Sequence, residues 1–218
     1  MKKTNFLLTT MMLGLSVSGL TQIALADDIN GNNSAEITIN GSIGKLDNTN
    51  PDTNIPEGSD EWINVTVDTV TAFHTTTASA HKNIESADYN IVNNSGRGVA
   101  VTLNKMEGTP KYVDTLAIEA KGNDLVEAPK KTNLVANNAL VDLTSSAVWM
   151  RLANKDGRLN IEDDAASAYA NSAKFFYTGT TTASLPTNVN ETAAKEDYKL
   201  TLKFTSIQKD GTTIGVTP

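Results

Sequence analysis

Two histidines are the residues of this chain with the most obvious catalytic potential. His74 and His81 lie in a stretch rich in Thr, Ala and Ser. A histidine oriented by an acid can activate a serine hydroxyl, and two histidines can hold zinc once a third ligand joins them. The sequence supplies no Gly-x-Ser-x-Gly turn and nominates no third ligand. We therefore interpret both as polar loop residues and expect no catalytic residue, no metal site and no cofactor.

Oxygen-rich and acidic runs are the next candidates for chemistry. Residues 28–32 (Asp-Ile-Asn-Gly-Asn) and 47–52 (Asp-Asn-Thr-Asn-Pro-Asp) space oxygen atoms as calcium ligands are spaced. The first run lacks the Gly and the Glu that complete a calcium loop. Residues 162–164 are three consecutive acids, whereas glycoside hydrolysis needs two carboxylates held apart across a sugar. Solvated loops, and a solvated turn or helix N-terminus at 162–164, are the simpler interpretations.

Three aromatic residues form the candidate ligand-binding set: Trp62, Trp149 and Tyr177. Aromatic rings that lie flat on a surface can stack on sugar rings. Each tryptophan occupies the position opposite the apolar residues of its predicted strand, and successive strand side chains point to opposite faces. This predicts both tryptophans on an outer face. The alternative is that a loop covers them or that they belong to a second core face.

The N-terminus predicts export from the cytoplasm. A short basic start with Lys2 and Lys3 precedes a mostly apolar stretch at 6–23, and Ala-Leu-Ala follows at 24–26. This order is typical of a secretory signal peptide cleaved after Ala26. We expect a secreted protein, either released or held non-covalently at the cell surface, because no second long apolar segment or sorting tail follows.

Composition narrows the class of partner. The whole chain of 218 residues carries a net charge of −7. Cleavage of the predicted signal would remove two lysines and leave the mature part more acidic still. Nucleic acids and anionic membrane surfaces attract basic proteins, so we expect neither as a partner. The chain has no cysteine, which excludes disulfides and thiol chemistry. Its stability must therefore come from a packed core.

Short alternating segments predict an all-β fold. Strands rich in Thr and Val are separated by turns rich in Asn, Asp and Gly, a pattern typical of an antiparallel β-sandwich of the Ig-like or Greek-key type with long polar loops. The predicted strands are 35–40, 62–67, 88–92, 98–104, 112–118, 140–143, 147–152, 174–177 and 198–207. Residues 122–138 are predicted to be mostly irregular, and the Ala-rich residues 162–173 to form one or two helical turns. We divide the chain into the signal (1–26), a polar segment with one short strand (27–60) and the sandwich (61–218).

Two of these segments carry a family resemblance. Residues 89–103 (YNIVNNSGRGVAVTL) resemble a strand–turn–strand of the WxL-type surface proteins of Gram-positive bacteria, and residues 198–207 (YKLTLKFTSI) are similar to the last strand of that family. The defining Trp-x-Leu is replaced by Val-Thr-Leu at 101–103 and by Phe-Thr-Ser at 204–206. The resemblance implies a β-sandwich, non-covalent association with the cell wall and a role in surface complexes. We carry over no wall-binding residue, because the tryptophans are missing.

These observations together predict a secreted, non-catalytic, adhesion-type protein of the bacterial surface. Its partner would be a cell-wall polymer, or a surface or host protein or glycan, recognised by loops and exposed strand faces. One alternative is a structural subunit of a fibre or pilus-like assembly, since an alternating strand such as 198–207 can pair across a sheet edge. The other is a carbohydrate-binding module that uses Trp62, Trp149 or Tyr177. The sequence leaves the oligomeric state open.

Overall fold

The fold is described from a computed structural model of the chain. It describes residues 46–121, 125–127, 131–144, 147–190 and 192–213. The predicted signal peptide (1–26) and the predicted strand at 35–40 lie outside the described residues. Within the described part, no helix is long and apolar enough to cross a membrane.

Eleven strands and two 3-10 helices make up the described part of the chain. The strands are β1 (Val65–Val67), β2 (Phe73–Thr75), β3 (Asn83–Ser86), β4 (Tyr89–Asn93), β5 (Val99–Gly108), β6 (Val113–Lys121), β7 (Thr132–Ala136), β8 (Ala139–Leu140), β9 (Val148–Leu152), β10 (Ser172–Thr181) and β11 (Tyr198–Ser206); the helices are η1 (Asp60–Trp62) and η2 (Thr77–Ser79).

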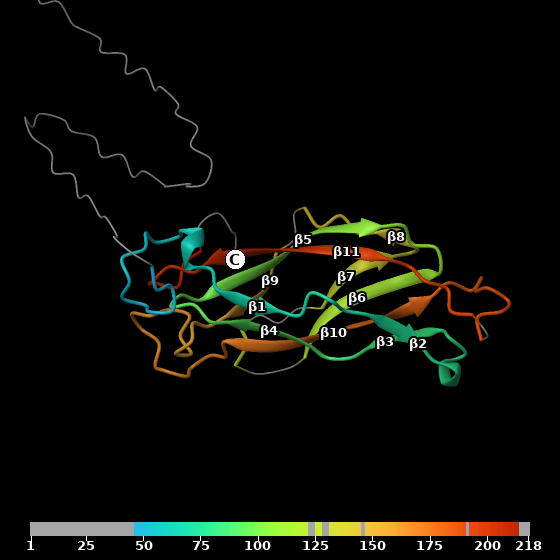
Figure 1. Cartoon of the computed structure of the whole chain (residues 1–218), viewed down its shortest axis with the longest axis horizontal. Coiled ribbons are helices and arrows are strands. Elements are labelled where there is room, and N and C mark those ends of the chain that lie inside the picture. The colour runs from blue at the N-terminus through green and yellow to red at the C-terminus, as the bar shows by residue number, and fades with distance from the viewer. Residues whose placement is uncertain (1–45, 122–124, 128–130, 145–146, 191, 214–218) are drawn as a thin grey trace, which may run out of the picture. The chain divides into compact units, whose positions relative to one another are not determined.

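The strands form two antiparallel sheets (Figure 1). The larger sheet has eight strands in the order β1-β4-β10-β6-β7-β8, with β3 also paired to β10 and β2 paired to β3. The smaller sheet has the order β11-β5-β9. The predicted all-β antiparallel sandwich is therefore confirmed. Every strand pairing among the described residues is antiparallel.

The longest ladder of the smaller sheet joins β5 to β11, from Tyr198 opposite Gly108 to Ser206 opposite Val99. Alternation explains which way β11 faces. Leu202 and its apolar neighbours pack against the core, whereas Lys203 is exposed. A period of two is what a strand with one buried face requires.

The core fills the space between the sheets. Trp149 of β9 meets Phe175 of β10 edge to face, with ring centroids 5.9 Å apart. Both rings are buried, and so are Leu116 and Ile118 of β6 and Leu134 of β7. Because each fully buried side chain of this size contributes about 1.5–3 kcal/mol, this layer stabilises a chain that has no cysteine and hence no disulfide.

Three of the predicted segments differ from the structure. Residues 122–138, predicted to be mostly irregular, contain the strand β7, which the sequence pattern did not indicate. The strand expected to begin at Trp62 begins at Val65, because Trp62 ends the helix η1. Residues 162–173 form no helix: the Ser167 and Tyr169 amides donate to the carbonyls of Asp156 and Gly157 rather than along a helix. The preceding turn therefore takes the hydrogen bonds that a helix would need.

A buried cation fastens the loop before η1 to the sandwich. Arg97 follows the β4–β5 turn and its side chain is 1 % exposed. Its guanidinium forms an ion pair of 2.6 Å with Glu57, donates to the Pro51 carbonyl at 2.7 Å and lies over the Trp62 ring, 4.1 Å from its centroid. The backbone of Gly96 also packs closely against Pro51, since a Cβ on Gly96 would lie 2.7 Å from the Pro51 nitrogen. Residues 46–60 are thereby held on the folded unit.

Candidate functional site

A cleft of about 1090 Å³ lies between the two sheets. Its walls are apolar side chains from both sheets, and its rims are the β1–β2 connection, strand β11 and the loop that precedes β11. A cavity of this size with mostly apolar walls is the usual form of a binding site. It is the candidate functional site.

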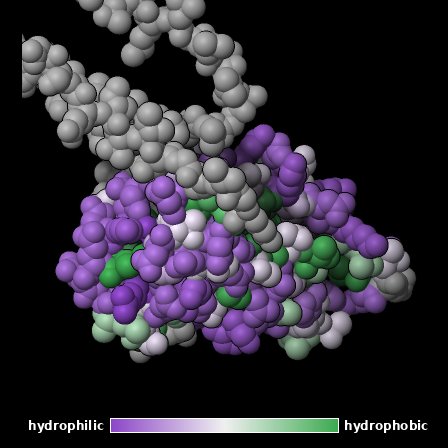
Figure 2. All heavy atoms as spheres, turned by 60° about the vertical axis from the view of Figure 1, so that its left-hand side comes forward, coloured by the Kyte–Doolittle hydropathy of each residue, from purple (hydrophilic) through white to green (hydrophobic). Residues whose placement is uncertain are grey.

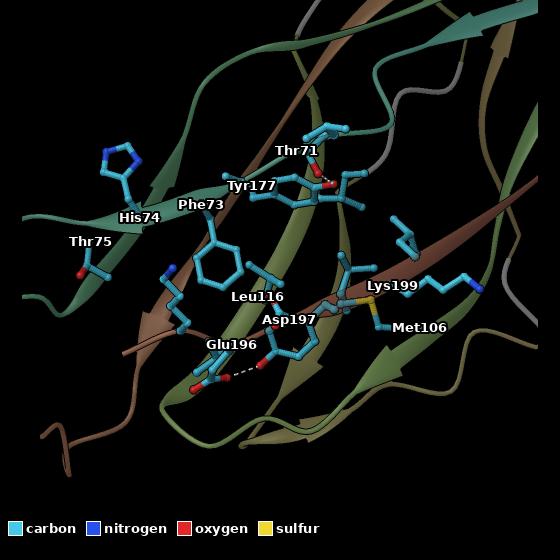
Figure 3. Close-up of a pocket in the computed structure, with 18 of the residues that line it drawn as sticks. Thr71, Phe73, His74, Thr75, Met106, Leu116, Tyr177, Glu196, Asp197 and Lys199 are labelled. Atoms are coloured by element: carbon cyan, nitrogen blue, oxygen red, sulfur yellow. Dashed lines mark hydrogen bonds between the residues drawn. The ribbon is translucent and has the colours of Figure 1, made fainter. Parts of the chain in front are cut away.

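The floor of the cleft comes from the core of the larger sheet. Leu116 and Ile118 of β6 lie beside Phe175 and Tyr177 of β10, and Met106 of β5 closes the opposite side. Figure 3 shows Tyr177, Leu116 and Met106 converging on the same space from different strands. The Tyr177 and Phe175 rings meet edge to face at 6.2 Å, which fixes both side chains. The floor is therefore preformed.

The rims leave apolar surface within reach of solvent. Leu200, Leu202 and Phe204 of β11 are only half-buried although they pack against the core. Opposite them, Phe73 of β2 is half-buried, and Val70 in the β1–β2 connection is 92 % exposed. Figure 2 shows hydrophobic patches interrupting a largely hydrophilic face of the molecule. Exposed apolar surface bordered by polar residues is typical of an interaction site.

Two strand edges border this cleft. Among the described residues, β11 pairs only with β5 and β1 pairs only with β4. A strand that is paired on one side presents N–H and C=O groups along its other side. The apolar walls are thus accompanied by backbone groups that a further strand can bond.

Polar groups at the rim hold the cleft in shape. The hydroxyl groups of Tyr177 and Thr71 share a hydrogen bond of 3.1 Å. The Glu196 carboxylate accepts bonds of 2.5 Å from both the Tyr112 amide and the Tyr198 hydroxyl, so it ties the loop before β11 to the start of β6 (Figure 3). Each bond stabilises the rim more than an exposed one does, because it is partly shielded from water.

Burial perturbs two tyrosines of the cleft. Burial raises the pKa of Tyr177 above its ordinary value, although the hydrogen bond to Thr71 opposes the rise. Burial also raises the pKa of Tyr198, and the hydrogen bond and the negative charge of Glu196 raise it further. Both hydroxyls are therefore neutral donors at physiological pH rather than nucleophiles or bases.

The expected outward placement of the tryptophans is wrong. Trp62 is 0 % exposed: it lies under Arg97, and its Nε1 donates to the Pro56 carbonyl at 3.2 Å. Trp149 is 1 % exposed and forms part of the core beside Phe175. Neither ring offers a face for stacking. Only Tyr177 of the three predicted ligand-binding residues lines the cleft, and its binding role stays a prediction.

The two histidines both line the cleft, and His81 bonds Thr75, the chain neighbour of His74. His74 is exposed and points away from Phe73 in Figure 3, whereas His81 bonds Thr75 through Nδ1 at 2.8 Å and Asn190 through Nε2 at 2.9 Å. The described residues contain no cluster of three or more His, Asp or Glu arranged to hold a metal ion. Asp164 instead accepts the amides of Leu159 and Asn160 in a turn. The oxygen-rich run at 28–32 lies outside the described residues.

The chain matches no family model, and a search of curated proteins finds none that is similar to it.

Sequence reasoning missed the cleft itself. The alternation at 198–207 predicts one apolar face for that strand, but it does not tell whether a second strand covers that face. The signal that pointed to this site was the long alternating segment 198–207 and its capacity to pair across an edge.

Proposed function

We propose that this chain is a secreted, non-catalytic protein of the bacterial surface that binds an extended segment of another polypeptide in the cleft between its sheets. The observation that carries the proposal is the combination of half-buried apolar side chains on β11 with the second edge of the same strand, which pairs with no other strand among the described residues. A bound segment would bond the edge through its backbone and place alternate side chains in the cleft. The predicted signal peptide supports an extracellular setting.

A polypeptide fits this cleft better than a glycan does. Sugar recognition relies on exposed aromatic faces and many polar contacts, whereas both tryptophans are buried and the floor of the cleft is mostly apolar, with the polar residues at its rims. Backbone pairing supplies affinity that depends little on sequence, and the pockets between side chains supply specificity. Under this proposal, the adhesion-type role expected from the sequence would act through β11.

The test compares two neighbouring positions of β11. Leu202 lines the cleft, whereas Lys203 is exposed and does not line it. We expect Leu202→Asp to abolish retention of the exported protein on whole cells or on host matrix, because a charge in the cleft excludes an apolar strand. Lys203→Asp introduces the same side chain on the other face and should leave retention unchanged. Equal retention of the two variants, with both folded by circular dichroism, would refute the proposal.

A further inference from the structure

The cleft and the edge of β11 need an occupant that is itself an amphipathic strand. The segment must place apolar side chains at alternate positions over Leu200, Leu202 and Phe204, and it must extend along the nine residues of β11. At about 3.3 Å per residue, such a strand spans about 30 Å. It must also present a polar face on the side away from the cleft.

The chain carries one such segment ahead of the described residues. Residues 36–44 read Glu-Ile-Thr-Ile-Asn-Gly-Ser-Ile-Gly. The odd-numbered positions carry Ile37, Ile39, a glycine at 41 and Ile43, so in a strand they would lie on one face. The even-numbered positions from 36 to 42 are all polar and would lie on the other face. The segment has nine residues, as β11 has, and its pattern is that of a strand with one apolar face.

The direction in which the chain enters the fold favours residues 36–44 of a second copy over those of the same molecule as the occupant of the cleft. Asn48 bonds the Glu61 carbonyl at 3.1 Å, and Ser206 at the end of β11 bonds the Ser59 carbonyl at 3.2 Å. The chain therefore enters the described fold at the end of β11. If its own residues 36–44 lay along the cleft, they would run parallel to β11. Parallel pairing is slightly weaker per residue, and every described pairing of this fold is antiparallel.

We propose that residues 36–44 of one copy of this chain add as an antiparallel strand to β11 of a second copy, with Ile37, Ile39 and Ile43 in the cleft. A segment from another molecule enters from either end, so it can run opposite to β11 along its whole length. The inference rests on the proposed function and names the partner as the chain itself. Charge favours it as well, because Lys199 and Lys203 flank the edge of an otherwise acidic protein.

The geometry of this contact predicts a linear assembly. The donor surface (residues 36–44) and the acceptor surface (the cleft and β11) are different parts of the chain, so each copy can donate once and accept once. Contacts of this head-to-tail kind are heterologous and continue as open-ended chains unless the rotation closes a ring. At a cell surface the product would be a fibre.

The test uses the exported chain and a pair of matched variants. Ile37→Asn with Ile39→Asn removes the apolar face of the donor, whereas Thr38→Asn with Ser42→Asn changes its polar face only. Sedimentation velocity over a concentration series should show chains of increasing length for the parent and for the Thr38/Ser42 variant. For the Ile37/Ile39 variant, the dissociation constant of self-association should rise on the order of a hundredfold or more. The reason is that burying one aliphatic side chain changes an equilibrium constant about tenfold or more, and two such side chains are lost.

Mixing identifies the acceptor. The Ile37/Ile39 variant keeps an intact cleft, so it should bind the free donor segment at one end of parent chains and stop growth at that end. The same variant carrying Leu202→Asp as well has neither a donor nor an acceptor surface, so it should lack this effect. A parent protein that stays monomeric at all concentrations, whether or not the Ile37/Ile39 change lowers its stability, would overturn the inference. If that monomer still binds cells through Leu202, the proposed function stands and only the choice of partner is wrong. If the protein binds neither a second copy nor cells, both the proposed function and the inference are refuted.

Discussion

The ion pair between Arg97 and Glu57 offers a sharp test of how the fold holds its N-terminal loop. Replacing Glu57 by Gln keeps an acceptor for the guanidinium but removes the charge. The Arg97 side chain is 1 % exposed and the Glu57 side chain 36 % exposed. The substitution therefore leaves a buried cation with neutral partners only: the new amide oxygen, the Pro51 and Gly96 carbonyls and the Trp62 ring.

The magnitude follows from the degree of burial. Removing one partner of a fully buried ion pair costs about 3–5 kcal/mol. Because water reaches Glu57 and glutamine still accepts a hydrogen bond, we expect Glu57→Gln to lower the free energy of unfolding by about 1–2 kcal/mol. Arg97→Lys removes both the bidentate contact with Glu57 and the planar stack on Trp62, so we expect it to lower the free energy of unfolding by about 3 kcal/mol. A domain of this size loses roughly 2–4 °C in melting temperature per kcal/mol.

Urea unfolding followed by tryptophan fluorescence measures these changes. The control is Glu107→Gln, which breaks the exposed pair with Lys105 and should leave stability unchanged. The slope of unfolding free energy against urea should stay the same in all three variants, because the folded surface does not change. If Glu57→Gln and Arg97→Lys are as stable as the parent, Arg97 does not fasten the loop and the reasoning is refuted.

Three further predictions follow from the same structure. Gly179→Ala places a Cβ 2.0 Å from the Thr115 carbonyl oxygen, so we expect a loss of about 2–3 kcal/mol or more in the same urea assay, and an unchanged midpoint would contradict the β6–β10 register. Because burial raises the pKa of Tyr177 and Tyr198 above the unfolded value, the stability that these two tyrosines contribute should be fully present below about pH 10 and be lost as the pH rises further; absorbance at high pH should show two late-ionising tyrosines, one of them lost in Tyr198→Phe. Trp62 and Trp149 should resist quenching by iodide and show no change in emission on addition of wall glycans, whereas ready quenching would place a ring at the surface.

The sequence could predict where many of the strands lie, but it could not predict what covers each face of a strand. The segments around β4, β5, β9 and β11 could be predicted because apolar and polar residues alternate in their sequences. β7 was missed because a short strand of a curled sheet lies in a polar stretch with little periodicity. The helix expected at 162–173 failed because alanine content alone does not outweigh the turn hydrogen bonds made by Asp164 and its neighbours.

The candidate site shows the same limit. Alternation assigns Trp149 to the face opposite Met150, yet both are buried, because β9 is covered on each side. Trp62 was misplaced because the strand was extended backward over a 3-10 helix. Period two distinguishes two faces of a strand, but it does not tell whether the second face meets solvent or protein. The cleft depends on which strands share a sheet, and that is a property of topology.

The most direct test of the account is contact at β11 in living cells. A photoreactive amino acid at position 202 of the exported chain should cross-link to an extended segment of another polypeptide, identified by mass spectrometry, and our further inference names residues 36–44 of a second copy. The same group at position 203 should give no such product, because Lys203 faces away from the cleft. Equal cross-linking from both positions, or none from position 202, would contradict the claim that this cleft binds a strand.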